Sequence, residues 1–89
     1  MKTIPGEFQL GALQFRVEIV TQEQMAAISG DSENIPWGLF CPGDGTIYVQ
    51  RVRRGFNKQA QLHAFWHEFF HALFWSLGRM EMYHDEVLV

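Results

Sequence analysis

The chain has 89 residues, of which 47% are hydrophobic and 15% aromatic. This length suits a single domain spanning residues 1–89, and the composition excludes an intrinsically disordered segment. The formal net charge of −3 argues against nucleic acid as the main partner, because binding to phosphates favours a basic surface.

The first elements that the sequence predicts are two strands. Residues 13–20 alternate between apolar and polar side chains, which is typical of a half-buried strand. Its apolar face should consist of Leu13, Phe15, Val17 and Ile19. A short strand over residues 7–10 is expected before it, with Gly11 and Ala12 in the turn.

A short helix and a hairpin are expected next. Thr21 and Gln24 have the spacing of a capping box, which predicts a helix over residues 22–28 that Gly30 ends. The Asp44-Gly45 pair lies between two β-prone runs, residues 37–41 and 46–51, and therefore predicts a hairpin. We interpret the basic cluster that follows as a solvated strand end and turn; it comprises Arg51, Arg53, Arg54 and Lys58.

The longest predicted element is a helix over residues 58–77. Asn57 is placed to cap its start, and Gly78 stands where a helix-ending glycine belongs. Apolar residues cover most of its circumference, which predicts a buried helix. Residues 80–89 are long enough to begin a second short helix.

Three ionisable residues interrupt this apolar helix. His67 and His71 are four positions apart, so both imidazoles lie on one face and can bind the same ion. Glu68 is turned about 100° around the helix from His67, where a carboxylate can take a proton from a zinc-bound water. A metal would also compensate the cost of placing these groups on an apolar helix. The sequence therefore predicts one zinc ion bound by His67 and His71, with Glu68 as catalytic base.

A third protein ligand is needed, and four residues after Gly78 are candidates. Glu86 leads, because the fourteen residues after His71 allow a turn and the start of another helix. The alternatives are His84, Asp85 and Glu81. We expect His63 to lie in the second shell or on the surface, and Cys41 to lie away from the metal.

The motif His67-Glu68-Phe69-Phe70-His71 resembles that of the zincin superfamily. More closely, the chain resembles small zincin-like metallopeptidases of phages and bacteria, related to the ImmA/IrrE type. The resemblance covers roughly the C-terminal half and extends to a Gly-Thr-Ile-Tyr-Val strand at 45–49, to Gln59 or Gln61, and to Asp85-Glu86. Phe74 and Leu77 stand where metzincins have glycine and histidine, which excludes that branch.

The resemblance implies an α+β fold in which a small twisted, mainly antiparallel sheet packs on a long active-site helix. It implies zinc held by His67, His71 and, as in gluzincins, by Glu86. It also implies an edge strand that binds the substrate backbone, for which residues 46–50 are the natural candidate. Relatives continue past the third ligand, whereas this chain stops three residues after Glu86. We therefore expect either an unusually minimal domain or a truncated version with a weak or disordered site.

We therefore expect a zinc metallopeptidase acting on a protein or peptide substrate, with regulatory proteins among the candidates. Tyr48, Tyr83 and His84 are candidates for stabilising the oxyanion. The alternatives are a zincin-like module that binds zinc or a protein without turnover, and a structural domain without metal. The single Cys41 fits a reducing compartment. With no apolar run of signal-peptide or membrane-spanning length, we expect a cytoplasmic protein without a membrane partner.

Overall fold

The computed structural model describes the backbone of residues 4–84 and the side chains of residues 4–77. The elements follow the order β1 (Glu7–Leu10), β2 (Leu13–Val20), α1 (Gln22–Ser29), β3 (Gly38–Cys41), β4 (Thr46–Gln50) and α2 (Lys58–His84). The predicted mixed α+β class is confirmed. Each predicted strand is present, and the two helices begin where the sequence analysis placed them.

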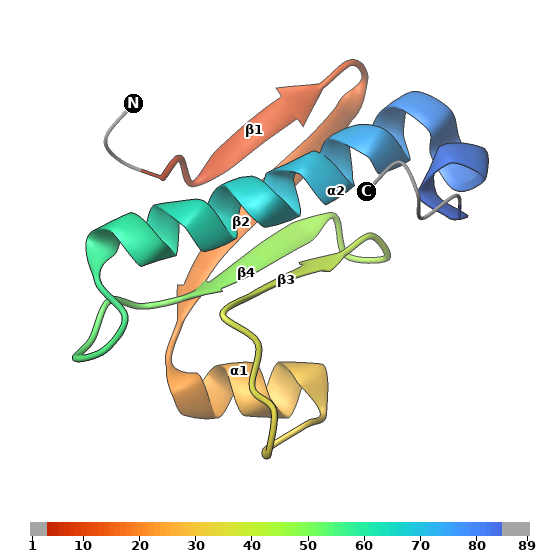
Figure 1. Cartoon of the computed structure of the whole chain (residues 1–89). Helices are drawn as coiled ribbons and strands as arrows, with labels where there is room; N and C mark the ends of the chain where they lie inside the picture. The colour runs from red at the N-terminus through yellow and green to blue at the C-terminus, as the bar shows by residue number, and fades with distance from the viewer. Residues whose placement is uncertain (1–3, 85–89) are drawn as a thin grey trace.

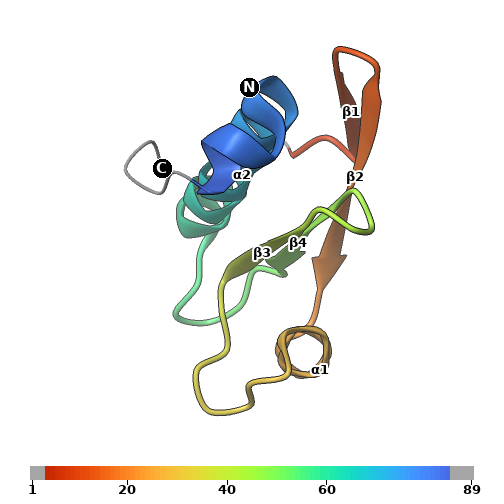
Figure 2. The same ribbon diagram turned by 90° about the vertical axis from the view of Figure 1, so that its right-hand side faces the viewer.

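The four strands form one sheet in the order β1-β2-β4-β3 (Figure 1). β1 pairs with β2 and β3 pairs with β4 in antiparallel fashion, whereas β2 and β4 run parallel. The parallel pair requires a connection that leaves the sheet and returns, and the segment containing α1 supplies it. Viewed from the side, α2 lies along one face of the sheet and α1 lies beyond one end of it (Figure 2).

The core lies between α2 and the face of the sheet that it covers. Phe65 and Ala72 of α2 are buried against side chains from three strands, among them Phe15, Phe40 and Ile47. Aromatic rings dominate this layer: Phe15 stacks on Phe8 with ring centroids 5.3 Å apart. Such a layer contributes both apolar burial and favourable ring geometry, and it fixes α2 on the sheet.

One residue departs from the predicted face of β2. Phe15 and Val17 are buried as expected, but Ile19 is 47% exposed and Val20, on the opposite face, is buried. The alternation itself is intact. Phe15 and Val17 pack in the core with residues of α2, whereas Ile19 on the same face does not. The alternation of apolar and polar residues in the sequence does not indicate where this contact ends.

The predicted turns and caps are present. Thr21 and Gln24 form the capping box of α1, and Gly30 ends the helix in the left-handed region with φ 77°. The β3–β4 hairpin closes through Asp44 and Gly45, whose backbone N–H groups donate to the carbonyls of Cys41 and Pro42. The positive φ of 63° at Gly45 explains the need for glycine there.

The long helix α2 begins as predicted but does not end there. The Asn57 side chain accepts a hydrogen bond of 2.9 Å from the Ala60 N–H, which caps the first turn. The expected stop at Gly78 is wrong, since the helix continues to His84. An interior glycine costs a helix only about 1 kcal/mol, and the residues after it, including Arg79, Met80 and Glu81, favour helix.

The prediction that α2 is buried all round is also wrong. Trp66, Phe70 and Leu77 are 37%, 50% and 67% exposed, because only one side of the helix contacts the sheet. Within the described part of the chain, neither helix combines the length and apolar content that crossing a lipid bilayer would require.

Candidate metal centre and substrate edge

The two predicted zinc ligands of α2 lie together. The Nε2 atoms of His67 and His71 are 3.3 Å apart, and the two rings are inclined by 73°. His67 is exposed and His71 is half-buried. Burial lowers the pKa of His71, and the charge of His67 acts in the same direction. The helix therefore brings two imidazole nitrogens to one point at the surface.

This geometry suits a shared zinc ion. Two nitrogens 3.3 Å apart, each about 2.05 Å from the metal, would subtend about 107° there, close to the tetrahedral angle of zinc sites. The same distance suits a hydrogen bond in which one ring nitrogen donates and the other accepts.

Glu68 lies between the helix and the sheet. Its pKa is raised by burial, while the charge of His67 and a hydrogen bond from the Phe40 backbone act in the opposite direction. The carboxylate is thus partly withdrawn from water but is held by the edge of β3. His67 and Glu68 line the same pocket, and the expectation that Glu68 borders a metal stays a prediction.

The close packing of Glu68 depends on a glycine in β3. A methyl group placed on Gly38 would lie 3.0 Å from the Glu68 Cγ and 3.2 Å from the Ala64 carbonyl oxygen. Both distances are shorter than the ~3.5–4.0 Å at which carbon atoms normally pack. Only glycine therefore lets strand and helix approach this closely beside the carboxylate.

Among the strands that the structure describes, β3 is the edge strand beside this site. The prediction that residues 46–50 form the edge strand is wrong: β4 is paired on both sides, with β2 and with β3. Residues 46–50 were expected at the edge because they immediately precede α2 in the sequence. In the structure, β4 precedes α2 from a central position in the sheet. An incoming peptide strand can pair only at β1 or β3, and of these two β3 contacts Glu68.

The ladder shows which groups of β3 are free. The Gln50 N–H donates to the Trp37 carbonyl over 3.0 Å, and Gly38 lies opposite Val49. Because hydrogen-bonded and non-bonded pairs alternate in an antiparallel ladder, Gly38 and Phe40 turn their backbone groups away from β4. The Glu68 side chain packs against Gly38 of this strand.

A pocket of about 470 Å³ opens beside Glu68, at the N-terminal half of α2. Gly38 and Trp37 form its sheet side, and His63, Ala64 and His67 are among the helix residues that line it. His63 was expected in the second shell or on the surface, and it is exposed. It borders the pocket one helical turn before His67. Phe56, from the β4–α2 loop, closes one end and stacks on Trp37 with centroids 4.4 Å apart.

Two buried glutamines hold these elements in place. The Gln61 side chain, on α2, donates to the Gln50 carbonyl over 3.1 Å. The Gln50 side chain donates to the Pro36 carbonyl over 2.8 Å, just before Trp37. Buried amides that satisfy backbone carbonyls fix position better than apolar contacts alone. Together they tie the helix, the end of β4 and the start of β3 into one unit.

Other predicted residues lie elsewhere or outside the description. Tyr48 alternates with the core residues Ile47 and Val49 and so lies on the face of the sheet away from α2, which removes it as an oxyanion donor. Burial, followed by the charges of Asp44 and Glu68, raises the pKa of Cys41 at the end of β3. The expectation that Cys41 lies away from the metal stays a prediction.

The third ligand falls outside what the structure describes. Glu86 and Asp85 follow the last described residue, and Glu81, Tyr83 and His84 belong to the final turns of α2, whose side chains are not described. Among the described residues, no group of three His, Cys, Asp or Glu side chains is placed to hold a metal ion. The reversal expected at Gly78 does not occur, since α2 runs on to His84.

Sequence reasoning missed Gly38, Trp37 and Phe56 as residues of the site. One signal was available for Gly38: it begins the first strand of the hairpin, and a glycine inside a strand often marks close approach of another backbone. No comparable signal marks the stack of Trp37 on Phe56, which joins two loops. Comparison of the chain with models of protein families, with curated proteins and with solved structures finds no significant match.

Proposed function

We propose that this protein is a zinc-dependent peptidase of the zincin type, acting on a protein or peptide substrate. The observation that supports this most directly is the pair of His67 and His71 nitrogens, 3.3 Å apart, beside a half-buried Glu68. The motif supplies two ligands and a base on one helix, and the sheet supplies a free edge next to them. The single Cys41 supports a cytoplasmic location.

The chain's own residues have separate tasks in this proposal. When bound, zinc supplies a Lewis acid that lowers the pKa of a water toward ~7. The Glu68 carboxylate takes the proton from the attacking water and returns it to the nitrogen of the leaving amine. His67 and His71 would hold the metal. Glu86 remains our prediction for the third ligand.

The substrate would lie along β3. An extended peptide can pair with the free backbone groups of Gly38 and with the Phe40 carbonyl, adding a strand to the sheet. Because the Glu68 side chain packs against Gly38, a peptide on this edge would run past the proposed base. Alternate side chains of such a peptide point to opposite faces, so one of them would face the pocket beside Trp37.

The proposal is tested by separating metal binding from cleavage. Wild-type protein should bind one zinc per chain and cleave an unfolded protein such as casein. Glu68→Gln should retain zinc and lose activity by about 10²–10⁴-fold. His71→Ala and Glu86→Ala should each lose most of the bound zinc. Glu23→Gln, which removes the same charge from the exposed face of α1, should leave both properties unchanged.

The outcomes separate the alternatives. Stoichiometric zinc without cleavage of any substrate would favour a module that binds zinc or a partner without turnover. Absence of zinc from the purified protein, with thermal stability unaffected by chelators, would favour a structural domain. Cleavage by Glu68→Gln at the wild-type rate would show that Glu68 is not the base.

A further inference from the structure

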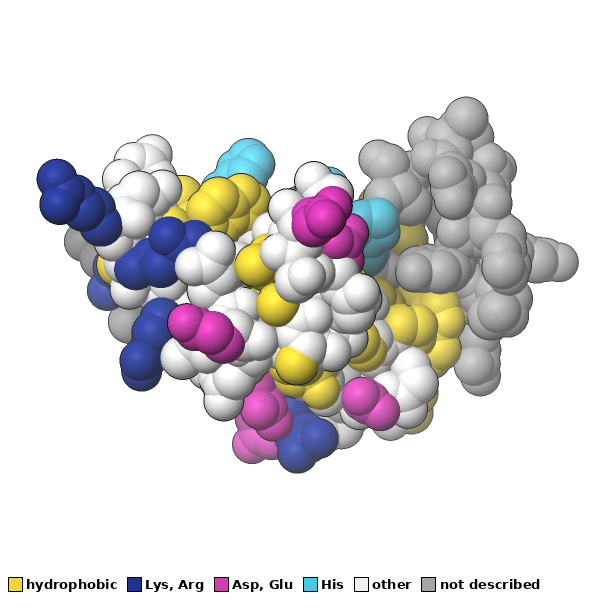
Figure 3. Space-filling model, turned by 90° about the horizontal axis from the view of Figure 1, so that it is seen from below, with side chains coloured by type: hydrophobic (Ala, Val, Ile, Leu, Met, Phe, Trp, Pro, Cys, Tyr) yellow, Lys and Arg dark blue, Asp and Glu magenta, His cyan; other side chains and the backbone are white. Residues whose placement is uncertain are grey.

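The loop between β4 and α2 carries much of the positive charge of the chain. The chain has seven lysine and arginine residues. Three of them, Arg51, Arg53 and Arg54, lie in this loop, and a fourth, Lys58, begins α2. This loop also supplies Gly55 and Phe56 to the wall of the pocket. Figure 3 shows lysine and arginine side chains gathered at one end of the molecule, next to apolar and histidine side chains. In a protein whose net charge is −3, basic residues thus precede and follow the two loop residues that line the pocket.

One of these four residues has a structural task. The Arg53 guanidinium lies over the Trp37 ring, 5.3 Å from its centroid. Its Nη2 and Nη1 atoms donate to the Gln50 side chain and the Arg54 carbonyl. Arg53 and Phe56 also exchange two backbone hydrogen bonds around Gly55. Arg53 therefore holds Trp37 and the loop in place and is not available to bind a ligand.

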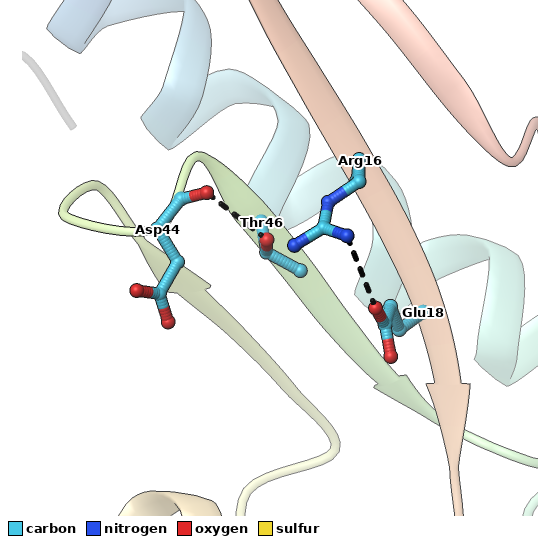
Figure 4. Close-up of polar contacts among 4 residues, drawn as sticks. All are labelled: Arg16, Glu18, Asp44 and Thr46. Atoms are coloured by element: carbon cyan, nitrogen blue, oxygen red, sulfur yellow. Dashed lines mark hydrogen bonds and ion pairs between the residues drawn. The ribbon is translucent and has the colours of Figure 1, made fainter.

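The other three residues have no such task. Arg51, Arg54 and Lys58 are exposed, and we call them the basic rim. Among the side chains that the structure describes, the single ion pair joins Arg16 and Glu18 at 4.0 Å, on β2 (Figure 4). The charges of the basic rim are thus unneutralised by the described part of the chain. A ligand with negative charge beside the pocket would find them available.

We propose that the site prefers acidic polypeptide segments carrying an apolar anchor residue. The anchor side chain occupies the pocket between Trp37, Phe56 and Ala64, and acidic residues beside it face Arg54 and Lys58. This inference rests on the proposed function, in that the peptide pairs with the free edge of β3. It adds the class of substrate, which neither the histidine pair nor Glu68 specifies.

The pocket and the edge together favour a peptide over other anionic ligands. The pocket volume of about 470 Å³ lies within the ~300–1,000 Å³ typical of ligand pockets, and its walls are mainly apolar. A free strand edge beside it binds a peptide backbone but offers nothing specific to a phosphate backbone. Nucleic acid would also meet the unfavourable net charge of the chain.

The test measures binding to three synthetic peptides by fluorescence anisotropy. All three carry the same central phenylalanine, flanked by glutamate, glutamine or lysine residues. The zinc-loaded Glu68→Gln variant is used throughout, so that no peptide is cleaved during the measurement. The glutamate peptide should bind most tightly and the lysine peptide most weakly. The higher affinity of the glutamate peptide should decrease with added salt, since exposed charges are screened over ~10 Å at 0.1 M.

Charge-removing variants locate the effect. Arg54→Gln and Lys58→Gln should each weaken binding of the glutamate peptide by about two- to fivefold, as expected for exposed ion pairs. Binding of the glutamine peptide should hardly change. Arg16→Gln is the matched control: it removes the same charge from β2 and should leave the affinity for all three peptides unchanged. These exposed side chains make no contact on which folding depends.

The failure of this inference and that of the proposed function are distinguishable. Equal binding of the three peptides, or an equal effect of Arg16→Gln, would refute the acidic preference even if casein is cleaved. A salt-sensitive preference for the glutamate peptide would sustain it even if the wild-type protein cleaves nothing. A short single-stranded oligonucleotide that binds more tightly than the glutamate peptide, and loses affinity in Arg54→Gln, would refute it in favour of nucleic acid.

Discussion

The close approach of Gly38 to α2 makes a prediction that separates the proposed base from the proposed metal ligands. In Gly38→Ala, the new methyl group would meet the Glu68 Cγ at 3.0 Å and the Ala64 carbonyl oxygen at 3.2 Å. Relieving the contact with the Ala64 carbonyl oxygen requires β3 and α2 to separate by a few tenths of an ångström. The Glu68 side chain can rotate away, but the Ala64 carbonyl belongs to the helix backbone and moves only with the helix.

We expect this overpacking to cost about 1–3 kcal/mol of the free energy of unfolding. For a domain of this size, that lowers the midpoint of thermal unfolding by about 4–20 °C, measurable by circular dichroism. Gly43→Ala is the matched control, because a methyl group there has no neighbour within 4 Å and neither glycine has a positive φ. The control should be neutral or stabilising by up to about 1 kcal/mol.

Zinc affinity provides the second measurement on the same variant. His67 and His71 are joined by their own helix, so Gly38→Ala should leave metal binding nearly unchanged while cleavage decreases with the displacement of Glu68. Equal melting temperatures for Gly38→Ala and Gly43→Ala would refute the close approach. If Gly38→Ala lost zinc binding and activity to the same extent, the inference that β3 positions Glu68 independently of the histidines would be refuted.

Two further predictions concern the cap and the titration of α2. Asn57→Ala removes the bond to the Ala60 N–H and should cost about 1 kcal/mol of stability, whereas Asn57→Asp should restore it in thermal unfolding; equal stability of both variants would contradict the cap. Burial lowers the pKa of His71 in the folded protein below its usual 6.5. As the pH falls, the unfolded chain therefore protonates this imidazole at a higher pH than the folded protein does. The metal-free protein should therefore lose stability as the pH falls below 6.5 through the folded pKa. Glu68 has a pKa raised above 4.5 and has the opposite effect. Its contribution to the free energy of unfolding is present below pH 4.5 and is lost as the pH rises through its folded pKa. Urea unfolding of wild type and His71→Gln across this range checks the assignment, and an unchanged pH dependence in His71→Gln would contradict it.

Local patterns were sufficient for most elements and for the proximity of the two histidine rings. The capping box at Thr21, the hairpin at Asp44-Gly45 and the cap at Asn57 each depend on residues within a few positions of one another. The same holds for His67 and His71, because four positions on a helix fix the relation of two side chains. These features were predictable since their physics is contained in short segments.

Features that depend on strand order were not predictable in the same way. Thr46 to Gln50 has the same apolar pattern whether it lies at the edge or in the middle of a sheet, and only its parallel pairing with β2 decides this. The exposure of Ile19 likewise depends on where α2 crosses the sheet. The continuation of α2 through Gly78 reflects a penalty too small to stop a helix whose following residues favour it.

The hydrogen-bonded histidine pair and the strand beside Glu68 have different folding requirements. His67 and His71 are brought together by one helical turn, whereas Gly38 and Glu68 lie thirty positions apart and meet only in the finished sheet. A nascent or partly denatured chain with α2 formed would thus capture metal without possessing a working base. Because such capture also favours the unfolded ensemble, zinc would raise the melting temperature by less than its affinity for the native protein implies. Hydrolysis, in contrast, would be confined to molecules whose distant segments have already joined.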